Sequence, residues 1–196
     1  MNPDVTARRR DAAMAGHTGR VDDALSATQD EDPAVRATAL ASLQRLGALP
    51  AAMLQAALAD RSSAVRRRAA ELAATRRDVS LLAALDDPEP TVVEMAAFAA
   101  GEQEGADPAV LARLAVLATR HRDALVREAA VAALGAIGHD DGLPAILAAT
   151  TDKAAVRRRA IIALAPFDGP DVDAALERAR ADRDWQVRQA AEDLSS

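Results

Sequence analysis

Apolar residues recur along the chain at the spacing of one face of an α-helix. Counted from a valine, the positions 0, 4, 7 and 8 are apolar, as in Val65, Ala69, Leu72 and Ala73. Residues at these offsets lie on one side of a helix, which therefore has a face suited to packing. The pattern predicts six such helices, with their valines at Val35, Val65, Val93, Val126, Val156 and Val187.

A shorter apolar segment precedes each of these helices and predicts a partner helix. Between the two segments stand residues that begin helices well, such as Asp32-Pro33 and Asp123. The unit of two helices recurs roughly every 30 residues, a period typical of solenoids. The partner helices are expected at 21–25, 51–59, 79–85, 109–118, 143–149 and 172–179.

The two ends of the array differ from its middle. Residues 4–19 predict one helix without a partner, which would cap the first repeat. In the last repeat, Glu192 holds a position that is apolar in the other repeats, as a terminal cap requires. We therefore expect a single all-α domain over residues 1–196. It would be an α-solenoid of about thirteen helices, with a capping helix at 4–19 and six repeats over 20–196.

A short apolar helix, an Asp-Pro turn and the motif Val-Arg-x-x-Ala-x-x-x-Leu-Gly recur in the chain, for example at residues 32–36 and 126–135. This combination resembles the HEAT-repeat family, most closely the short bacterial form called the PBS-lyase HEAT-like repeat. The resemblance implies a right-handed superhelix whose second helices line a concave surface. It also implies a protein-binding scaffold, since members of the family serve mainly in that role.

The resemblance further implies a role for the arginine of the motif. In similar proteins such arginines and the aspartates near them form a ladder between adjacent repeats, because a planar guanidinium can bridge a carboxylate and helix ends. An anion-binding stripe is the alternative role. The expected ladder residues are Asp32, Arg36, Asp60, Arg66, Asp123, Arg127, Asp152, Arg157, Asp184 and Arg188.

Charge and composition narrow the classes of function. The formal net charge of −6 disfavours non-specific binding to nucleic acid or to an anionic membrane. The absence of cysteine excludes disulfides, thiolate metal sites and cysteine nucleophiles. No apolar run is long enough for a membrane span, and the first residues lack the pattern of a signal peptide. We expect a cytoplasmic protein, and Lys153 as the only lysine suggests a GC-rich bacterial genome.

Four arginines beside the motif are candidates for contact with a partner. Arg67, Arg68, Arg158 and Arg159 belong to two arginine triplets and turn away from the packed face, toward the expected concave surface. One interpretation is a solvated surface in an arginine-rich chain. The other is a contact patch for an acidic partner.

The third and last repeats carry further candidates. In the third repeat Glu94 takes the place of the motif arginine, and Met95 and Phe98 replace smaller or polar residues. Sequence drift would explain these changes, and so would a partner-specific surface. Trp185 stands in the turn before the last second helix, where it either covers the final groove between repeats or serves as an exposed anchor for binding.

No catalytic or cofactor motif stands out. The histidines are not followed by glutamate, unlike the His-Glu pairs of HEAT-like iron hydroxylases, and no phosphate loop or nucleophile elbow is present. We therefore expect no cofactor and no metal, and a monomeric, non-catalytic scaffold that binds a protein or peptide. A DNA-binding or DNA-repair protein is the first alternative, and an accessory or lyase-like subunit of an enzyme system is the second. The histidines are His17, His121 and His139.

Overall fold

The structure is a computed structural model that describes residues 3–103, 105 and 107–194. All regular secondary structure in these residues is helical, which confirms the prediction of an all-α solenoid. The twelve α-helices and two short 3₁₀ helices are α1 (Pro3–Thr18), α2 (Val21–Ala27), α3 (Pro33–Arg45), α4 (Ala51–Ala57), α5 (Ser63–Ala73), η1 (Ala84–Asp86), α6 (Pro90–Glu102), α7 (Pro108–Arg120), α8 (Ala124–Ile137), η2 (Asp140–Gly142), α9 (Leu143–Ala149), α10 (Ala154–Ala163), α11 (Pro170–Arg180) and α12 (Trp185–Asp193).

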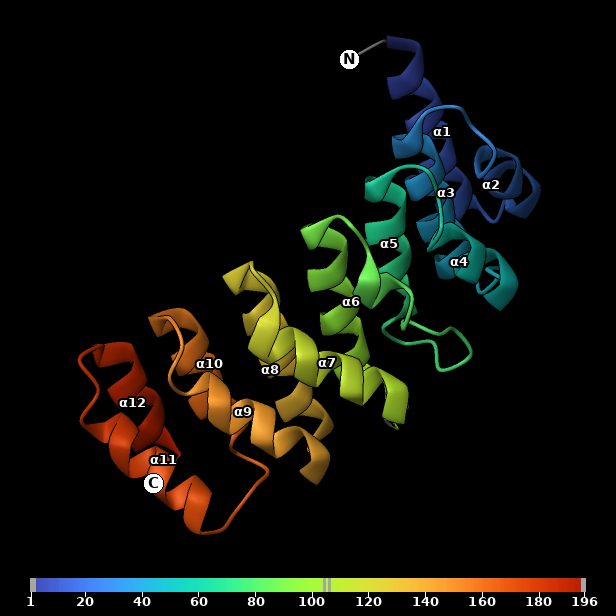
Figure 1. Ribbon diagram of the computed structural model, residues 1–196. Helices are drawn as coiled ribbons and strands as arrows, with labels where there is room; N and C mark the ends of the chain where they lie inside the picture. The colour runs from blue at the N-terminus through green and yellow to red at the C-terminus, as the bar shows by residue number, and fades with distance from the viewer. Residues whose placement is uncertain (1–2, 104, 106, 195–196) are drawn as a thin grey trace.

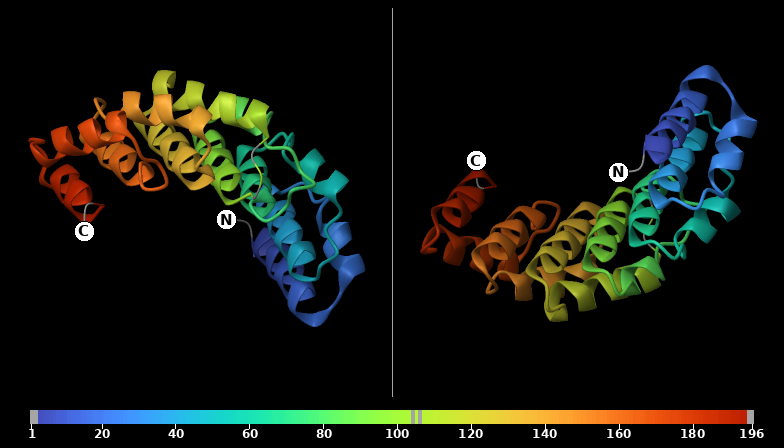
Figure 2. Two further views of the ribbon diagram at one scale, coloured as in Figure 1. Left: turned by 90° about the horizontal axis from the view of Figure 1, so that it is seen from below. Right: turned by 90° about the horizontal axis from the view of Figure 1, so that it is seen from above.

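The helices form two layers that curve into an arch (Figure 1). One layer consists of α1, α3, α5, α6, α8, α10 and α12, each of which packs against the next. The other layer consists of α2, α4, α7, α9 and α11 (Figure 1). Figure 2 shows that the first layer lies on the inner, concave side of the arch and the second on its outer side.

The second helix of a repeat forms for reasons that are visible in α8. The side chain of Asp123 accepts a hydrogen bond from the backbone N–H of Leu125 (2.9 Å) and caps the first turn. Val126, Ala130 and Leu134 then lie on one buried face. Because alanine fills so many of the packed positions, neighbouring helices approach closely and the core is a thin layer between them.

The N-terminal helix α1 continues the inner layer. It spans Pro3–Thr18, where the sequence predicts a helix over 4–19, and it packs against α3. The buried hydroxyl of Ser42 donates to the backbone carbonyl of Ala12 (2.8 Å), which ties the two helices together. The helix therefore covers the first repeat in the way that a second helix of a preceding repeat would.

The predicted helix at 79–85 is wrong. This segment consists of turns that end in η1, which is why the structure has twelve α-helices and not thirteen. Val79 and Leu81 are both buried although they are two residues apart, a spacing that would place them on different sides of a helix. The amide of Gln103 donates to the carbonyl oxygens of Ala73 and Arg76 (both 2.9 Å) and satisfies part of this irregular backbone.

The repeat motif in α6 begins one residue earlier than the sequence suggests. The N–H of Val93 donates to the carbonyl oxygen of the N-cap residue Glu89 (3.3 Å), a bond that the motif arginines make in the other second helices. Val92 is therefore the motif valine, and the buried Val93 holds the place of the arginine. The prediction that Glu94 replaces the arginine needs this correction. Since two valines are adjacent, the sequence pattern fits either register.

Candidate functional site

A ladder of ion pairs runs along the array and, in the part of the chain that the structure describes, joins successive repeats at every junction except that between α6 and α8. The motif arginine reaches the aspartate in the turn of the next repeat, as Arg36 does with Asp60 (Nη2 to Oδ1 2.7 Å). Its other nitrogen donates to a carbonyl oxygen in its own turn, that of Asp30 (2.9 Å). The five pairs are Arg8–Asp30, Arg36–Asp60, Arg66–Asp87, Arg127–Asp152 and Arg157–Asp182.

Three of the predicted ladder aspartates have another role. The side chains of Asp32, Asp123 and Asp184 accept hydrogen bonds from backbone N–H groups two residues ahead and cap α3, α8 and α12. The ladder instead uses Asp30, Asp87 and Asp182, which the sequence analysis missed together with Arg8. Arg188 donates to the carbonyl oxygen of Asp182 (2.7 Å). Both kinds of aspartate stand in the same short turns, so the sequence shows two acids without showing which one points to the preceding repeat.

The junction between α6 and α8 is built differently. Val93 stands where other repeats carry the ladder arginine, and His121 stands where they carry the aspartate. Nδ1 of His121 accepts from the N–H of Asp123 (3.1 Å), as the carboxylate of Asp60 does from Ser62 (2.8 Å). An apolar residue and a histidine therefore replace a charged pair at this one place in the stack.

The ladder makes the stability of the fold dependent on pH, with a loss of stability in acid. Hydrogen bonds from Arg127 and Arg157 hold the pKa values of Asp152 and Asp182 below the usual value for aspartate. A depressed carboxyl pKa stabilises the folded state fully above the unfolded pKa of about 4, and the contribution is lost as pH falls below it. We expect the urea midpoint to be level between pH 7 and 5 and to fall below pH 4, measured by circular dichroism.

The matched variants for this measurement are Asp182→Asn and Asp11→Asn. Asp182 pairs with Arg157, whereas Asp11 is an exposed aspartate in the middle of α1. The first variant should lose stability at pH 7 and show a shallower acid transition, while the second should follow the parent protein. An equally steep transition in Asp182→Asn would show that this pair does not carry the acid sensitivity.

The first part of the concave surface is a basic hollow over α1, α3 and α5. It has a volume of about 720 Å³, and among the residues that the structure describes Glu71 is the one acidic residue in its lining. Glu71 pairs with Arg68 (2.8 Å), and in the described part of the chain no carboxylate lies within ion-pair distance of the other arginines. The structure thus places Arg67 and Arg68 together with three arginines that the sequence analysis missed. The arginines of the basic hollow are Arg9, Arg10, Arg45, Arg67 and Arg68.

The second part is an apolar pocket of about 440 Å³ between α6 and α8, here called the Phe98 pocket. Phe98 is 52% exposed and Leu125 is 60% exposed, although both are large and apolar. Glu94 and Glu128 also line the pocket. Its remaining lining residues are Met95, Ala129, Ala132 and Arg159.

The register of α6 explains why Phe98 is exposed. Counted from Val92, Phe98 lies at offset 6, the position that Ile162 occupies in α10, and both side chains are exposed on the concave side. The structure brings together Glu94, Met95 and Phe98, as the hypothesis of a partner-specific surface requires. Leu125 was missed, because an apolar residue in the first turn of an amphipathic helix gives no signal of its own.

The third part is a pocket of about 390 Å³ between α10 and α12, here called the Trp185 pocket. The side chain of Trp185 is 64% exposed, so it does not cover a groove between repeats. It shares the pocket with Ile162 and Arg158. The interpretation of Trp185 as a cover for the groove is therefore wrong, and its role as an anchor for binding stays a prediction.

Arg158 and Arg159 differ from Arg67 and the other exposed arginines of the basic hollow. Both are half-buried, as Arg68 is, and their Nε atoms are buried without a hydrogen-bond partner among the described residues. Arg159 lies 3.5 Å from Glu128 across the junction of α8 and α10. The two arginine triplets therefore have different surroundings, and only the first one lies in a strongly basic surface.

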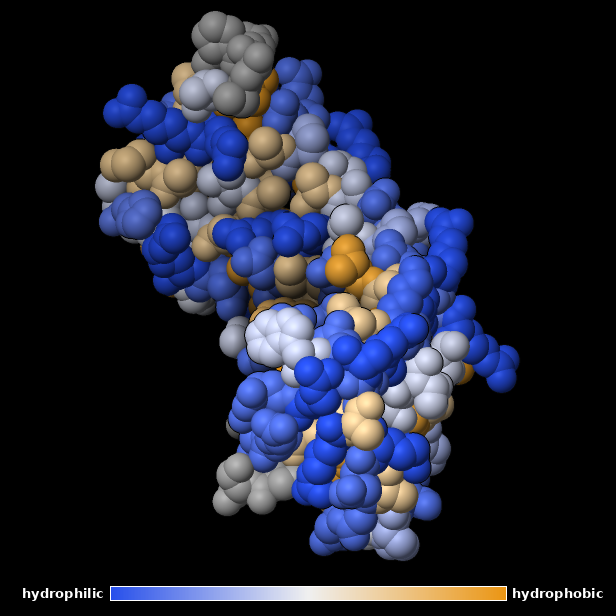
Figure 3. Space-filling model, turned by 90° about the vertical axis from the view of Figure 1, so that its left-hand side faces the viewer, coloured by the Kyte–Doolittle hydropathy of each residue, from blue (hydrophilic) through white to orange (hydrophobic). Residues whose placement is uncertain are grey.

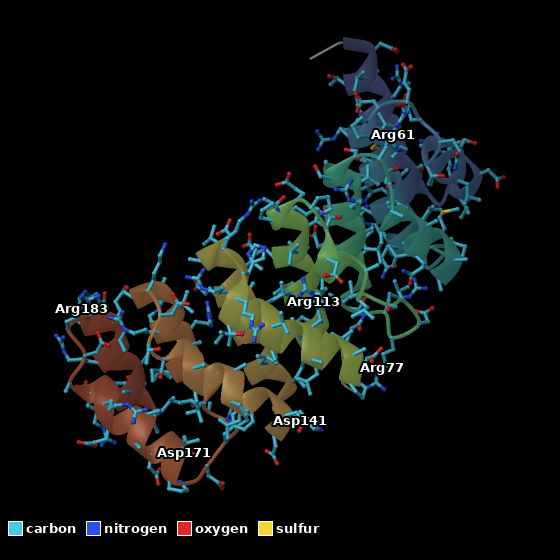
Figure 4. The ribbon with its side chains drawn as sticks, viewed as in Figure 1. Arg61, Arg77, Arg113, Asp141, Asp171 and Arg183 are labelled. Atoms are coloured by element: carbon cyan, nitrogen blue, oxygen red, sulfur yellow. The ribbon has the colours of Figure 1, made fainter. Side chains whose placement is uncertain are left out.

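The hollowed face can be followed in the space-filling view. Apolar atoms lie in the hollow between hydrophilic borders when the molecule is seen from the side of α12 (Figure 3). Other arginines lie away from it: Arg113 pairs with Asp86 (2.6 Å), and Arg61 donates to the carbonyl oxygen of Glu31 (3.1 Å; Figure 4). Arg183 stands in the turn before α12 (Figure 4).

Two further features bear on the chemistry of the chain. In the described residues, no three histidine, aspartate or glutamate side chains come close enough together to hold a metal ion. None of the helices described combines the length and the hydrophobicity that crossing a bilayer would demand.

Comparisons with known proteins agree with this architecture. The structure is similar to that of YibA from Escherichia coli, with a TM-score of 0.71 and 21% sequence identity over 94% of this chain and 74% of that one. It is also similar to human deoxyhypusine hydroxylase in complex with glycerol, with a TM-score of 0.51 and 22% identity over 96% of this chain and 77% of that one. At these identities the likeness shows the fold alone.

The sequence itself matches one family. Among curated proteins, none matches the chain. The family model described as HEAT repeats matches residues 79–165 and again residues 111–195, which together span more than half of the chain. With the stacked helical pairs, the repeated motif and the ladder between repeats, this match shows that the chain belongs to the HEAT-repeat family.

Proposed function

We propose that this protein is a non-catalytic scaffold that binds a protein or peptide along its concave surface. The observation that carries the proposal is the gathering of binding groups on one face. The basic hollow, the Phe98 pocket and the Trp185 pocket follow one another along the inner layer of helices. Exposed aromatic residues and arginines are the residue types that contribute most to binding energy in protein interfaces.

The charge around the aromatic residues supports a polypeptide over DNA. Glu94 and Glu128 line the Phe98 pocket, and Asp193 lines the Trp185 pocket. Aromatic residues that stack on bases stand in basic surroundings, because the phosphates come with the bases. The Phe98 pocket has two carboxylates and one arginine, Arg159, and the Trp185 pocket has one carboxylate and one arginine, Arg158, so neither pocket is a basic surface that would attract those phosphates.

Photo-crosslinking tests which face binds and what it binds. A photoreactive benzoylphenylalanine replaces Phe98 on the concave side or Ala112, an exposed residue of the outer helix α7, and each protein is irradiated in bacterial lysate. We expect discrete adducts from position 98 whose size nuclease does not change, and far weaker ones from position 112. Equal labelling at both positions would contradict the proposal, as would adducts that nuclease converts to the size of the protein alone.

A further inference from the structure

We propose that the partner segment is an extended peptide with an acidic stretch at one end and two apolar anchors beyond it. The acidic stretch lies in the basic hollow, and the anchors fill the Phe98 pocket and the Trp185 pocket. This inference rests on the proposed function and adds the chemistry and spacing of the segment that binds.

The charge of the basic hollow favours an acidic ligand. It holds five arginines and one glutamate, in a chain whose net charge is −6. Its charge is therefore opposite to that of the whole molecule. Carboxylates fit such a surface, because each guanidinium can donate two parallel hydrogen bonds to one carboxylate.

Most arginines of the basic hollow are free to bind such a ligand. The ladder arginines are already engaged by carboxylates, as Arg36 is by Asp60. Arg9, Arg10, Arg45 and Arg67 have no carboxylate within ion-pair distance among the described residues. Their donors face solvent and are available to a ligand, so binding would break no ion pair within the protein.

The apolar pockets require a different part of the same segment. Phe98, Met95 and Leu125 offer an apolar surface, and so do Ile162 and Trp185. Each pocket has a volume that suits single large side chains and not a folded domain. Glu94 and Glu128 outnumber Arg159 in the lining of the first pocket, so acidic residues of the partner are disfavoured there and favoured in the basic hollow.

Helix spacing sets the distance between the three contacts. Packed helices lie about 8–10 Å apart, and the Phe98 pocket and the Trp185 pocket are two helix positions apart, so about 16–20 Å separates them. An extended peptide advances about 3.3 Å per residue, which places the two anchors about five or six residues apart. The basic hollow centres on α3, so the acidic stretch lies about six to eight residues from the first anchor.

The probe is a fluorescein-labelled peptide with four glutamates, a seven-residue Gly-Ser spacer, phenylalanine, five spacer residues and leucine. It is made in both chain directions, since the contacts do not define the direction. There are three comparison probes. One is a peptide with the two anchors adjacent, and one is a peptide with serine in place of the glutamates. The third is a thymidine oligonucleotide of equal length. Binding is measured by fluorescence anisotropy at low and at physiological salt.

The variants separate the two kinds of contact. The double variant Arg9→Glu/Arg67→Glu changes the basic hollow, and Arg120→Glu/Arg178→Glu makes the same change in charge on the outer helices. Phe98→Ser removes an anchor site, and Val116→Ser is its control in the outer helix α7, where Val116 is exposed.

We expect one chain direction of the full probe to bind at least about tenfold more tightly than the adjacent-anchor and serine probes. The basic-hollow variant should abolish the preference for glutamate, Phe98→Ser should weaken binding about tenfold, and both controls should bind like the parent protein. Raising the salt concentration should lower the affinity for the acidic probe and leave the affinity for the serine probe unchanged.

Other outcomes overturn the inference in distinguishable ways. Equal affinity for the full and adjacent-anchor probes would refute the spacing, and no binding of any peptide would refute the chemistry of the segment. Tighter binding of the oligonucleotide would favour a nucleic-acid ligand. The crosslinking at positions 98 and 112 decides separately whether the concave face binds a polypeptide at all, so the proposed function can survive the failure of this inference.

Discussion

We expect the substitution Arg66→Met to lower the free energy of unfolding by about 3 kcal/mol at pH 7, because it leaves a buried carboxylate without its partner. The side chain of Asp87 is only 5% exposed, and two nitrogens of Arg66 donate to it at 2.6 and 2.8 Å. Burial raises the pKa of Asp87, but the hydrogen bonds from Arg66 and from the N–H of Glu89 outweigh that effect and leave the pKa lowered. Urea denaturation followed by circular dichroism measures the loss.

The neighbouring Arg67 provides a matched control. Arg67→Met makes the same chemical change one residue along the same helix, at an exposed side chain of the basic hollow. It should alter the unfolding free energy by no more than about 0.5 kcal/mol. The double variant Arg66→Met/Asp87→Asn should recover part of the loss, since it removes the uncompensated charge. If Arg66→Met and Arg67→Met unfolded at the same urea concentration, the ladder pair would contribute nothing to stability.

The substitution Gly135→Val should also lower the unfolding free energy by about 3 kcal/mol, through overpacking between α8 and α10. A Cβ atom at Gly135 would lie 2.6 Å from the Cβ of Ala163 and 2.7 Å from its Cα. The second of these atoms belongs to the backbone, so no change of rotamer relieves the contact. The two helices would have to separate, and the pockets on either side of them would change shape.

Two variants calibrate this effect. At Gly101 an added Cβ would lie 3.0 Å from the Cα of Ala133, so Gly101→Val should be destabilising but less so. Ala112→Val, at an exposed position of α7, measures the cost of valine in a helix without a clash and should stay near 0.5 kcal/mol. If Gly135→Val unfolded at the same temperature as Ala112→Val, the junction of α8 and α10 would be able to open without loss of stability.

The periodic part of this fold is predictable from the sequence because it depends on local chemistry. The apolar spacing in α8 and α10 identifies the buried faces, and Asp123 marks the start of its helix. Prediction fails at Val92 and Val93, where two adjacent valines satisfy the same pattern. A shift of one residue rotates a position by about 100° around the helix. Counted from Val93, Phe98 lies at offset 5, and counted from Val92 it lies at offset 6, the exposed position that Ile162 holds in α10.

The candidate site was only partly predictable, because its members come from different repeats. Arg67 and Arg68 were identified from their triplet, but Arg9 and Arg45 join them only when α1, α3 and α5 stack. The sequence does not show which side chains of successive repeats share a hollow, since the packing of the helices decides it. Trp185 is the first residue of α12, and it shares a pocket with Arg158 and Ile162 only because α10 and α12 pack side by side.

The junction at Val93 and His121 also fixes the order of the repeats. At the other junctions of the ladder, an arginine on one repeat meets an aspartate on the next, so these repeats present similar ends to one another. If another repeat preceded α8, its ladder arginine would meet His121 and would have no carboxylate partner. If another repeat followed α6, its ladder aspartate would meet the apolar side chain of Val93. At this junction the third and fourth repeats therefore match each other and no other repeat of the ladder, which penalises stacking of repeats out of register.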